Sequence, residues 1–413
     1  MLLPAEAARS ILRDISPNEP VPTALRDAQD LVLARDVASP IDLPPWDNSA
    51  MDGYAARAAD LTAPGVVLRV IEAVAAGRFP RKTVGQGQAT RIFTGAPLPK
   101  GADSAVRQED TTALRDGRVT VNDVRDAGRN IRRRGEDIRK GEVVLHAGTA
   151  LGPAQLGVLA SLAHGRPMVH RRPRIAYMGS GDEIVDLDQK RSILAGRKIA
   201  SSNSYTLHAL IARAGAIPVD LGIAKDTKGS LKQHLRRARG ADLLVTTAGV
   251  SVGEHDLVRQ VLTEMGCDMK LWRIKMRPGA PLGFGVLRGV PWIGLPGNPV
   301  STMVTFELFV RPVIRRLLGH ALPFRRTVPV RLEEPVTLGP KLRHFLRAVV
   351  SPATDNGALG ARLTGPQGSG ILTSMVRANA LLIVPEDRES VSAGETLFAL
   401  LLDDPHHVPE PPY

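Results

Sequence analysis

The sequence predicts a chain of several α/β and β domains, in which one α/β domain is built on a mostly parallel sheet. Three observations support this prediction. The chain has 413 residues, more than one hydrophobic core usually organises. Residues 174–318 alternate short apolar strands with amphipathic helices, which is typical of a parallel sheet. Residues 65–125 and 323–413 instead contain short β segments separated by Gly and Pro, and the second stretch predicts a small barrel or sandwich.

The composition is that of a globular protein and narrows the classes of function. A net charge of +12 suits an anionic ligand or partner, although ordinary surface charge gives the same balance. Aromatic residues make up only 4%, which argues against a base-stacking surface for single-stranded nucleic acid. The single Cys267 excludes an internal disulfide and a four-Cys zinc site. With no leader pattern and no apolar run near ~18 residues, a cytoplasmic protein without a membrane segment is expected.

The N-terminal part combines helical and irregular stretches. Residues 1–40 carry apolar residues at helical spacing and are predicted to be helical until Pro40 interrupts the pattern. In residues 44–57, PPWDNSAMDGYAAR, Asp47 and Asp52 lie in a segment with an Asp-Gly turn. A turn between two strands would explain the Asp-Gly pair, but not so many polar groups beside three large apolar side chains.

Two further polar segments follow. Residues 91–110, RIFTGAPLPKGADSAVRQED, predict a strand end and then a rigid, irregular loop that begins at Thr94-Gly95. Residues 128–142, GRNIRRRGEDIRKGE, contain three consecutive arginines that could contact phosphates, although such a run is more often a solvated face. A helix over residues 151–164 then precedes Arg171-Arg172-Pro173, which is a predicted domain boundary.

Acidic residues follow three strands of the α/β region. The first strand leads to Asp182 and Glu183, and a later strand leads to Asp226, which is expected to cap the next helix. The strand at residues 243–245 leads through small residues to Asp256. Ligands of open α/β sheets bind beyond the carboxyl ends of strands, where Gly-rich turns approach phosphate and carboxylates hold hard cations. A simple tight turn is the alternative for this third loop.

Basic residues and a helix start are expected at the same crevice. Arg273 and Arg277 are four residues apart and would face the same side of a single strand. The next strand runs into Asn298, which is predicted to cap a helix that continues to about Leu318. The free N–H groups of such a helix start favour an anion. The polar features of the C-terminal stretch are Arg347 and the loop 367–369, while two adjacent histidines in the tail are weak evidence for a metal site.

In this arrangement the chain resembles the MoeA family of molybdopterin molybdenumtransferases, which is related to the gephyrin E domain. The markers run in order from about residue 5 to residue 400 and are DNSAMDGYA, FTGAPLP, NIRRRGED, GDE, AGVSVGE, RPGAP and LPGNPVS. The resemblance implies a homodimer, with the site between the α/β domain of one subunit and the β-rich domain of the other. It also implies four domains: an elongated helical linker and dimerisation domain (1–45 plus 140–172), a β-rich domain (46–139), a MogA-like α/β molybdopterin-binding domain (173–322) and a C-terminal β-barrel (323–413).

The resemblance further implies an activity and its residues. The expected reaction is insertion of molybdate into adenylylated molybdopterin with Mg²⁺ and release of AMP. Phosphoanhydride cleavage suits a hard cation on oxygen ligands and cationic groups against the developing charge. The catalytic residues implied are Asp52, Thr94, Glu183, Asp226 and Asp256, of which Asp226 and Asp256 are expected to bind the metal; Asp137 is a further candidate. The substrate-binding residues expected are Ser251, Gly253, Arg273, Arg277, Pro296, Gly297, Asn298, Arg347 and Ser369.

The sequence departs from the family pattern at a few positions. Arg273 and Arg277 stand where bacterial members usually have Lys, which keeps the charge but adds a guanidinium fork that does not deprotonate. Ala280 replaces a residue that is often Lys, and Ala248 replaces a Gly of the third strand loop. None of these changes removes a carboxylate, so the enzyme interpretation stands.

Three other interpretations remain open at this point. Adenylyl transfer to molybdopterin is one, since the α/β domain resembles the adenylyltransferase of the preceding step. A non-catalytic molybdopterin-binding or scaffold paralogue is another, and nucleic-acid binding rests only on the net charge. The expected partners are a second subunit, small anionic substrates, the molybdopterin adenylyltransferase and apo-molybdoenzymes, with no nucleic acid and no membrane. The choice between molybdate and tungstate, and between the main insertase and a diverged paralogue, is not decided by the sequence.

Overall fold

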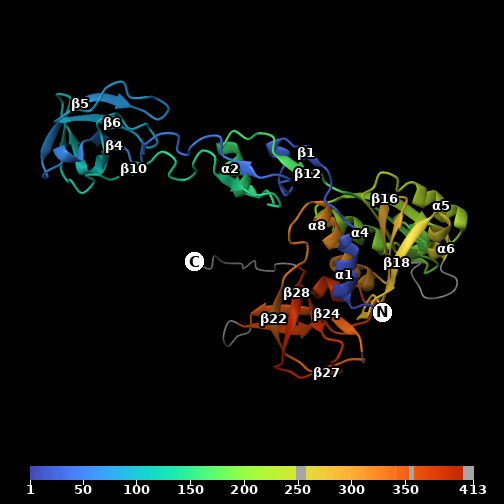
Figure 1. Ribbon diagram of the computed structural model, residues 1–413. Coiled ribbons are helices and arrows are strands. Elements are labelled where there is room, and N and C mark those ends of the chain that lie inside the picture. Colours follow the sequence, from blue (N-terminus) through green and yellow to red (C-terminus); the bar gives the residue numbers. More distant parts are fainter. Residues whose placement is uncertain (248–256, 340, 353–357, 403–413) are drawn as a thin grey trace. The chain divides into compact units, whose positions relative to one another are not determined.

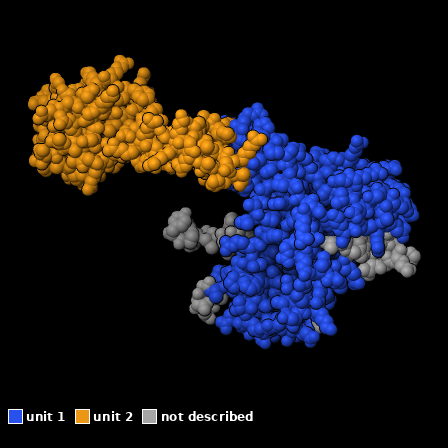
Figure 2. All heavy atoms as spheres, in the orientation of Figure 1, with its two compact units in different colours: residues 1–34, 148–153, 166–413 blue, residues 35–147, 154–165 orange. Residues whose placement is uncertain are grey.

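The computed structural model describes residues 1–247, 257–339, 341–352 and 358–402 (Figure 1). The chain forms two compact units, which are coloured separately in Figure 2. Unit 1 contains residues 1–34, 148–153 and 166–413, and unit 2 contains residues 35–147 and 154–165. The four domain boundaries expected from the sequence remain predictions. Within the described ranges, no helix is both long and apolar enough to cross a membrane.

Unit 1 contains the expected α/β sheet. Its four parallel strands are adjacent, and two antiparallel strands extend one side of the sheet. The prediction of a mostly parallel sheet is therefore confirmed. In spatial order the strands are β16 (Ile217–Ala224), β13 (Arg174–Ser180), β17 (Leu243–Thr247), β21 (Val290–Leu295), β20 (Pro281–Leu287) and β18 (Cys267–Arg273).

Helices pack on the sheet through two separate apolar cores. The larger core joins strand residues such as Tyr177 and Val245 to helices on one face, including the first helix of the chain through Ile11. The smaller core holds two helices against the sheet through Leu231 and Val261. The helices of the larger core are α1 (Pro4–Arg13), α4 (Ser202–Arg213), α7 (Pro299–Thr305), the π-helical segment η5 (Phe306–Val310) and α8 (Arg311–Leu317), and those of the smaller core are α5 (Lys228–Arg236) and α6 (Leu257–Glu264).

Two helix predictions need correction. Thr227, not Asp226, is the N-cap of α5, because its side chain accepts a hydrogen bond from the backbone N–H of Ser230. The Asp226 carboxylate is thus not used as a helix cap. The predicted helix after Asn298 does form, but it contains the π-helical turn η5 between α7 and α8.

The helical prediction for the N-terminal forty residues is only partly right. Helix α1 ends at Arg13, and residues 25–27 form only a short 3₁₀ turn, η1 (Leu25–Asp27). The backbone of residues 31–33 instead pairs with residues 149–151, and β1 (Pro20–Pro22) pairs with β12 (Met168–His170). These partners are far away in the chain, so the apolar spacing of residues 24–37 misled the prediction.

The C-terminal part of unit 1 is a closed five-stranded barrel. Its order is β24 (Arg343–Pro352), β25 (Leu359–Leu363), β22 (Thr327–Leu332), β28 (Thr396–Leu401) and β26 (Ala380–Val384), which pairs again with β24. A two-residue strand from the α/β domain, β19 (Met276–Arg277), runs parallel to β24 and adds to the barrel. The short helix α9 (Thr373–Arg377) and the pair β23 (Val336–Thr337) and β27 (Ser390–Val391) complete it.

Unit 2 is built on a six-stranded sheet. Its order is β7 (Ser104–Arg107), β4 (Gly53–Ala56), β6 (Gln88–Ile92), β5 (Val66–Val74), β9 (Arg118–Val121) and β8 (Thr111–Ala113). Two short ladders adjoin it, β3 (Asn48–Ser49) with β10 (Ile131–Arg132) and β2 (Val37–Ala38) with β11 (Val143–Leu145). The remaining helical pieces of this unit are α2 (Pro153–Ser161), η2 (Ala58–Asp60) and η3 (Gln108–Asp110).

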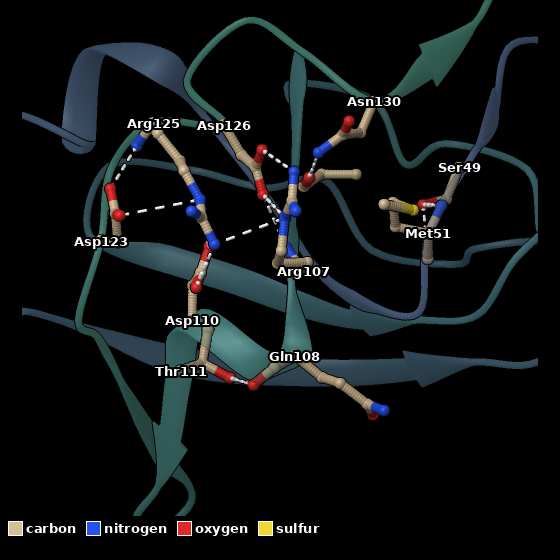
Figure 3. Close-up of polar contacts among 11 residues, drawn as sticks. Ser49, Met51, Arg107, Gln108, Asp110, Thr111, Asp123, Arg125, Asp126 and Asn130 are labelled. Carbon is tan, nitrogen blue, oxygen red and sulfur yellow. Dashed lines mark hydrogen bonds and ion pairs between the residues drawn. The ribbon is translucent and has the colours of Figure 1, made fainter.

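An ion-pair network stabilises the end of β7 in unit 2 (Figure 3). The buried Asp126 accepts from Nε and Nη2 of Arg107 at 2.9 and 3.0 Å and from its backbone N–H at 3.1 Å. Asp110 continues the network to Arg125, whose Nη2 lies 2.7 Å away. Burial raises the pKa of Asp126, but the hydrogen bonds from Arg107 outweigh it, so the pKa lies below its ordinary range.

Replacement of Asp126 by Asn is expected to destabilise unit 2 by about 2–3 kcal/mol, because it leaves the Arg107 charge without its buried partner. The native carboxylate stabilises the fold above the unfolded-state pKa of about 3.9, and this contribution disappears as the pH falls through the lower folded-state pKa. The variant should therefore show a weaker loss of stability below about pH 4. Hydrogen exchange of β7 and β9 measures both effects.

The matched control is Asp116→Asn in the same unit, which removes an exposed ion pair with Arg118. It should change local stability by less than about 0.5 kcal/mol. Equal protection of β7 in the Asp126 variant and in this control would show that the network has no such role.

Candidate active site

Two acidic residues meet at the carboxyl edge of the α/β sheet. Strands β13 and β16 run parallel with Ser180 opposite Ala224, so the residues that follow them are neighbours. The backbone N–H of Asp182 donates to Oδ2 of Asp226 at 3.3 Å, and that of Asp226 donates to Oδ1 of Asp182 at 3.1 Å. Both carboxylates are exposed. The structure thus places Asp226 next to Asp182, which the sequence located at this strand end but to which no role was assigned.

Glu183 follows Asp182 in the chain, and its carboxylate lies close to the backbone of Gly181. Gly181 has φ +138°, and a Cβ there would lie 2.8 Å from Oε2 of Glu183. Any larger residue would therefore displace the Glu183 carboxylate. The carbonyl oxygen of Glu183 accepts from Ile199 N–H at 2.9 Å, where β14 (Ile184–Val185) pairs with β15 (Ile199–Ala200). The two carboxyl ends of β13 and β16 together with Glu183 form an acidic rim.

A cavity of about 1000 Å³ opens next to this rim. Its polar lining includes Asp182 and Lys198, whose Nζ donates to the carbonyl oxygen of Asp182 at 2.6 Å. Tyr177 and His208 also line this cavity, and the hydroxyl of Tyr177 lies 3.1 Å from Nδ1 of His208. Burial and the nearby Asp220 raise the pKa of Tyr177, so its hydroxyl stays protonated. The volume and the mixed lining suit a small organic ligand.

The loop that leads to Asp256 lies outside the residues that the structure describes. Residues 248–256, which include Ser251, Gly253 and Asp256, are not among the described residues. Their expected roles, like the effect of Ala248, stay predictions. Among the residues that are described, no group of three or more His, Cys, Asp and Glu side chains is suited to a metal ion.

A buried arginine dominates a second site in unit 1. Arg347 on β24 is fully buried, and burial lowers its pKa to about 10. Its Nε donates to Oγ of Ser374 at 3.0 Å, and its Nη2 donates to the carbonyl oxygen of Gly368 at 3.0 Å. No carboxylate in the described part of the chain forms an ion pair with it. A buried cation without an anion is costly, so the site favours an anionic ligand.

This arginine lines a cavity of about 610 Å³ between the barrel and the α/β domain. Arg277 reaches the same cavity, because β19 runs beside β24 with Arg277 opposite His344. His344 is buried, which lowers its pKa, and its Nε2 lies 3.1 Å from the carbonyl oxygen of Gly339. Glu334 is the acidic residue in the lining, and its Oε1 accepts from Leu363 N–H. The lining of this cavity therefore contains two arginines and one acidic residue.

The loop that covers Arg347 also reaches the start of α7. Nδ2 of Asn298 donates to Oγ of Ser369 at 3.0 Å, and Val300 N–H donates to the Ser369 carbonyl oxygen at 3.1 Å. Asn298 occupies the N-cap position, but its side chain does not cap the helix. The Gly297 carbonyl oxygen accepts from Asn203, and that of Pro296 accepts from Oγ1 of Thr302. The structure thus brings the predicted residues 296–298, Ser369 and Arg347 into one neighbourhood.

The two predicted basic residues of the α/β region do not share one strand. Arg273 ends β18, which pairs with β20, whereas Arg277 belongs to β19, which pairs with β24. The chain leaves the α/β sheet between them, so the period-of-two argument does not apply. After Arg277 the backbone passes close to helix α7 at Gly279, which has φ +94°. A Cβ there would lie 2.4 Å from Cγ2 of Thr305.

Unit 2 carries the other predicted acidic site. Oδ1 of Asp52 accepts from the backbone N–H of Thr94 at 2.8 Å and from its Oγ1 at 2.7 Å. These bonds, with a smaller contribution from Arg91, hold the pKa of Asp52 below its ordinary range. Sequence analysis named both residues, and the structure places them together. Asp137 lies elsewhere in the unit, where its N–H donates to the Leu43 carbonyl oxygen.

The run of three arginines is mostly paired with acids. Nη1 of Arg133 lies 2.8 Å from Oδ2 of Asp47, and Nε of Arg134 lies 2.6 Å from Oδ2 of Asp42. All three arginine side chains are exposed. The geometry is that of a solvated, ion-paired face.

Comparison with known proteins identifies the class of molecule. The MoeA N-terminal region (domain I and II) matches residues 3–163, a probable molybdopterin binding domain matches residues 176–316, and the MoeA C-terminal region (domain IV) matches residues 329–402. The chain is thus a multidomain protein of molybdenum cofactor biosynthesis.

Relatives and solved structures give the particular family. A molybdopterin molybdenumtransferase of Haemophilus influenzae is 35% identical over 90% of this chain and 91% of its own length. Molybdopterin molybdenumtransferase 2 of Mycobacterium tuberculosis is 37% identical over 92% and 94%. The crystal structure of a molybdopterin biosynthesis moeA protein from Pyrococcus horikoshii OT3 aligns with a TM-score of 0.81 and 28% identity, over 97% of this chain and 100% of that one. The chain belongs to the MoeA family, as its sequence motifs predicted.

Proposed function

We propose that this protein inserts molybdate into adenylylated molybdopterin and releases AMP. The observation that carries the proposal is the buried Arg347, which has no carboxylate partner among the described residues and lines a cavity together with Arg277. A tetrahedral oxyanion such as molybdate would supply the missing negative charge, and a guanidinium can bind its oxygens in pairs. The activity that the names of the relatives carry agrees with this chemistry.

The acidic rim at the carboxyl edge suits Mg²⁺. Proteins usually hold Mg²⁺ with one or two carboxylates, while substrate phosphates and water complete the shell. Asp226 and its neighbour Asp182 are exposed oxygen donors that fit this pattern, and Asp256 is the second proposed ligand from the sequence. Bound there, Mg²⁺ supplies charge neutralisation at phosphate oxygens. Glu183 and the Asp52–Thr94 pair remain the proposed groups for orienting substrate and water.

We also propose that the protein acts as a homodimer, as in the arrangement that the family resemblance implies. Each unit carries a part of the proposed catalytic set, with Asp52 and Thr94 in unit 2 and Glu183 and Asp226 in unit 1. Light scattering after size-exclusion chromatography, together with mixing of an Asp52→Asn and an Asp226→Asn variant, tests the shared site. Recovery of activity in the mixture is expected, and its absence from a dimeric mixture would contradict it.

A turnover assay tests the function itself. The full-length protein receives adenylylated molybdopterin, Mg²⁺ and molybdate, and AMP and active cofactor are measured together. AMP release that requires molybdate and stops with a chelator is the expected result. Consumption of ATP with unmodified molybdopterin would instead show an adenylyltransferase. Substrate binding without any turnover would show a non-catalytic relative, and activity with tungstate alone would change the proposed substrate.

A further inference from the structure

A cation that forms no ion pair with any described residue lies beside Asp52 and Thr94. Arg91 belongs to β6, which pairs antiparallel with β4 so that Arg91 lies opposite Tyr54. The same two strands lead directly to Asp52 on one side and to Thr94 on the other. Arg91 therefore comes from the elements that carry the predicted acidic pair. It was not among the residues predicted for the site from the sequence.

Aromatic and polar contacts fix the position of this guanidinium. Its central carbon lies 4.8 Å from the centroid of the Tyr54 ring and 5.2 Å from that of the Phe93 ring. Nη2 donates to Oε1 of Gln108 at 2.7 Å, and Nη1 donates to the carbonyl oxygen of Gly53 at 3.4 Å. Two aromatic faces and two acceptors restrict the side chain to a narrow range of conformations.

Gln108, which accepts a hydrogen bond from Arg91, lies next to the ion-pair network at the end of β7. Gln108 directly follows Arg107, the residue that Asp126 binds (Figure 3). The backbone N–H of Gln108 also donates to the carbonyl oxygen of Asp52 at 2.9 Å. One residue therefore contacts both Arg91 and the backbone of Asp52. Gln108 thus links the cation to the acid, and it follows the residue that the Asp126 ion pair holds.

Within the described part of the chain, no close ion pair neutralises the positive charge of Arg91. No carboxylate of the described residues lies within 4.0 Å of its nitrogens, although the pKa of Asp52 responds to its charge. The exposed carboxylate of Asp52 repels an anionic substrate, and a fixed cation next to it offsets that repulsion. The N–H groups of Arg91 that do not bind Gln108 or Gly53 have no acceptor in the described parts of the chain.

We propose that Arg91 is an anion-binding residue of the site, which contacts an oxyanion of the substrate next to Asp52 and Thr94. The identity of this oxyanion rests on the proposed function. In that reaction the oxyanions that Arg91 could bind are the phosphate of adenylylated molybdopterin and molybdate. Both are tetrahedral and present paired oxygens to a guanidinium. Lysine would keep the charge but lose the fork and much of the contact with the two rings.

The test compares Arg91→Gln and Arg91→Lys with wild type in the full-length protein. Calorimetry measures binding of AMP and, separately, of molybdate. The glutamine variant is expected to bind one of these probes about 10-fold more weakly, since a charge-assisted hydrogen bond is lost. The lysine variant should recover part of the affinity. The probe that is affected identifies the oxyanion.

Arg118→Gln is the matched control, because Arg118 lies in the same sheet of unit 2 and, among the described residues, forms an ion pair only with the exposed Asp116. It should bind both probes as wild type does. Hydrogen exchange of β4 and β6 checks that the Arg91 variants remain folded. Unchanged affinity for both probes in a folded Arg91→Gln variant, or no binding of either probe by wild type, would overturn the proposal.

The same variants separate this inference from the proposed function. In the turnover assay, Arg91→Gln should raise KM for the substrate whose oxyanion it binds, while Arg118→Gln leaves KM unchanged. If wild type binds AMP or molybdate through Arg91 but shows no turnover, the proposed function fails and the anion-binding role stands. If turnover is normal and Arg91→Gln has wild-type KM values and affinities, only the role of Arg91 fails.

Discussion

Replacement of Asp226 by Asn is expected to lower kcat/KM for molybdate-dependent AMP release by about 10²–10³-fold. The amide can still accept the hydrogen bond from Asp182 N–H, so the loop geometry should survive. What the variant loses is the charge of a proposed Mg²⁺ ligand. The Mg²⁺ concentration for half-maximal rate should therefore rise as well, which a metal titration of the turnover rate measures.

Asp14→Asn provides a control for this variant. Asp14 is an exposed carboxylate of unit 1 that pairs with Lys270 at 2.8 Å. Loss of that surface pair should leave turnover and metal dependence unchanged. An Asp226→Asn enzyme with wild-type turnover and Mg²⁺ dependence would remove Asp226 from the proposed metal site.

Replacement of Arg347 by Met is expected to reduce turnover by about 10²–10³-fold and to raise KM for molybdate. Its effect on the free energy of unfolding should be small, within about 1 kcal/mol, for two opposing reasons. The variant loses hydrogen bonds to Ser374 and Gly368, but it also removes a buried charge that has no carboxylate partner among the described residues. Steady-state kinetics and urea unfolding measure the two effects separately.

Two further variants sharpen the Arg347 experiment. Arg347→Lys keeps a positive charge but loses the planar fork, so it should recover only part of the activity. Arg362→Met, on the neighbouring barrel strand β25, changes an exposed arginine and should behave as wild type. Loss of activity together with a large loss of stability in Arg347→Met would mean that the arginine is mainly structural.

The sequence predicted the α/β region well because its signals are local. Apolar strands alternate with amphipathic helices over residues 174–318, and the strand ends place acids at one edge of the sheet. The family motifs also predicted the barrel, and they named Asp52 and Thr94, which the structure joins by hydrogen bonds. The prediction was wrong for residues 24–37, because their apolar spacing suggested a helix whereas their backbone pairs with segments distant in the sequence.

The missing parts of the site depend on contacts between distant segments. Nothing in the sequence around Arg347 shows that it is fully buried, since burial results from the barrel and the loop at residues 367–369. The reciprocal bonds of Asp182 and Asp226 join residues 44 positions apart. The role of Arg91 depends on Tyr54 and Gln108, which reach it from two other elements. Periodicity and local motifs do not carry such information.

The strand β19 has a consequence for exchanging parts between family members. It belongs in sequence to the α/β domain, but its backbone bonds lie with β24 of the barrel, and its Arg277 faces the cavity of Arg347. A chimera cut after α8 would therefore combine a foreign barrel with an edge strand selected for another partner. Exchanging residues 276–277 together with the barrel would keep the β19–β24 pairing within one parent sequence.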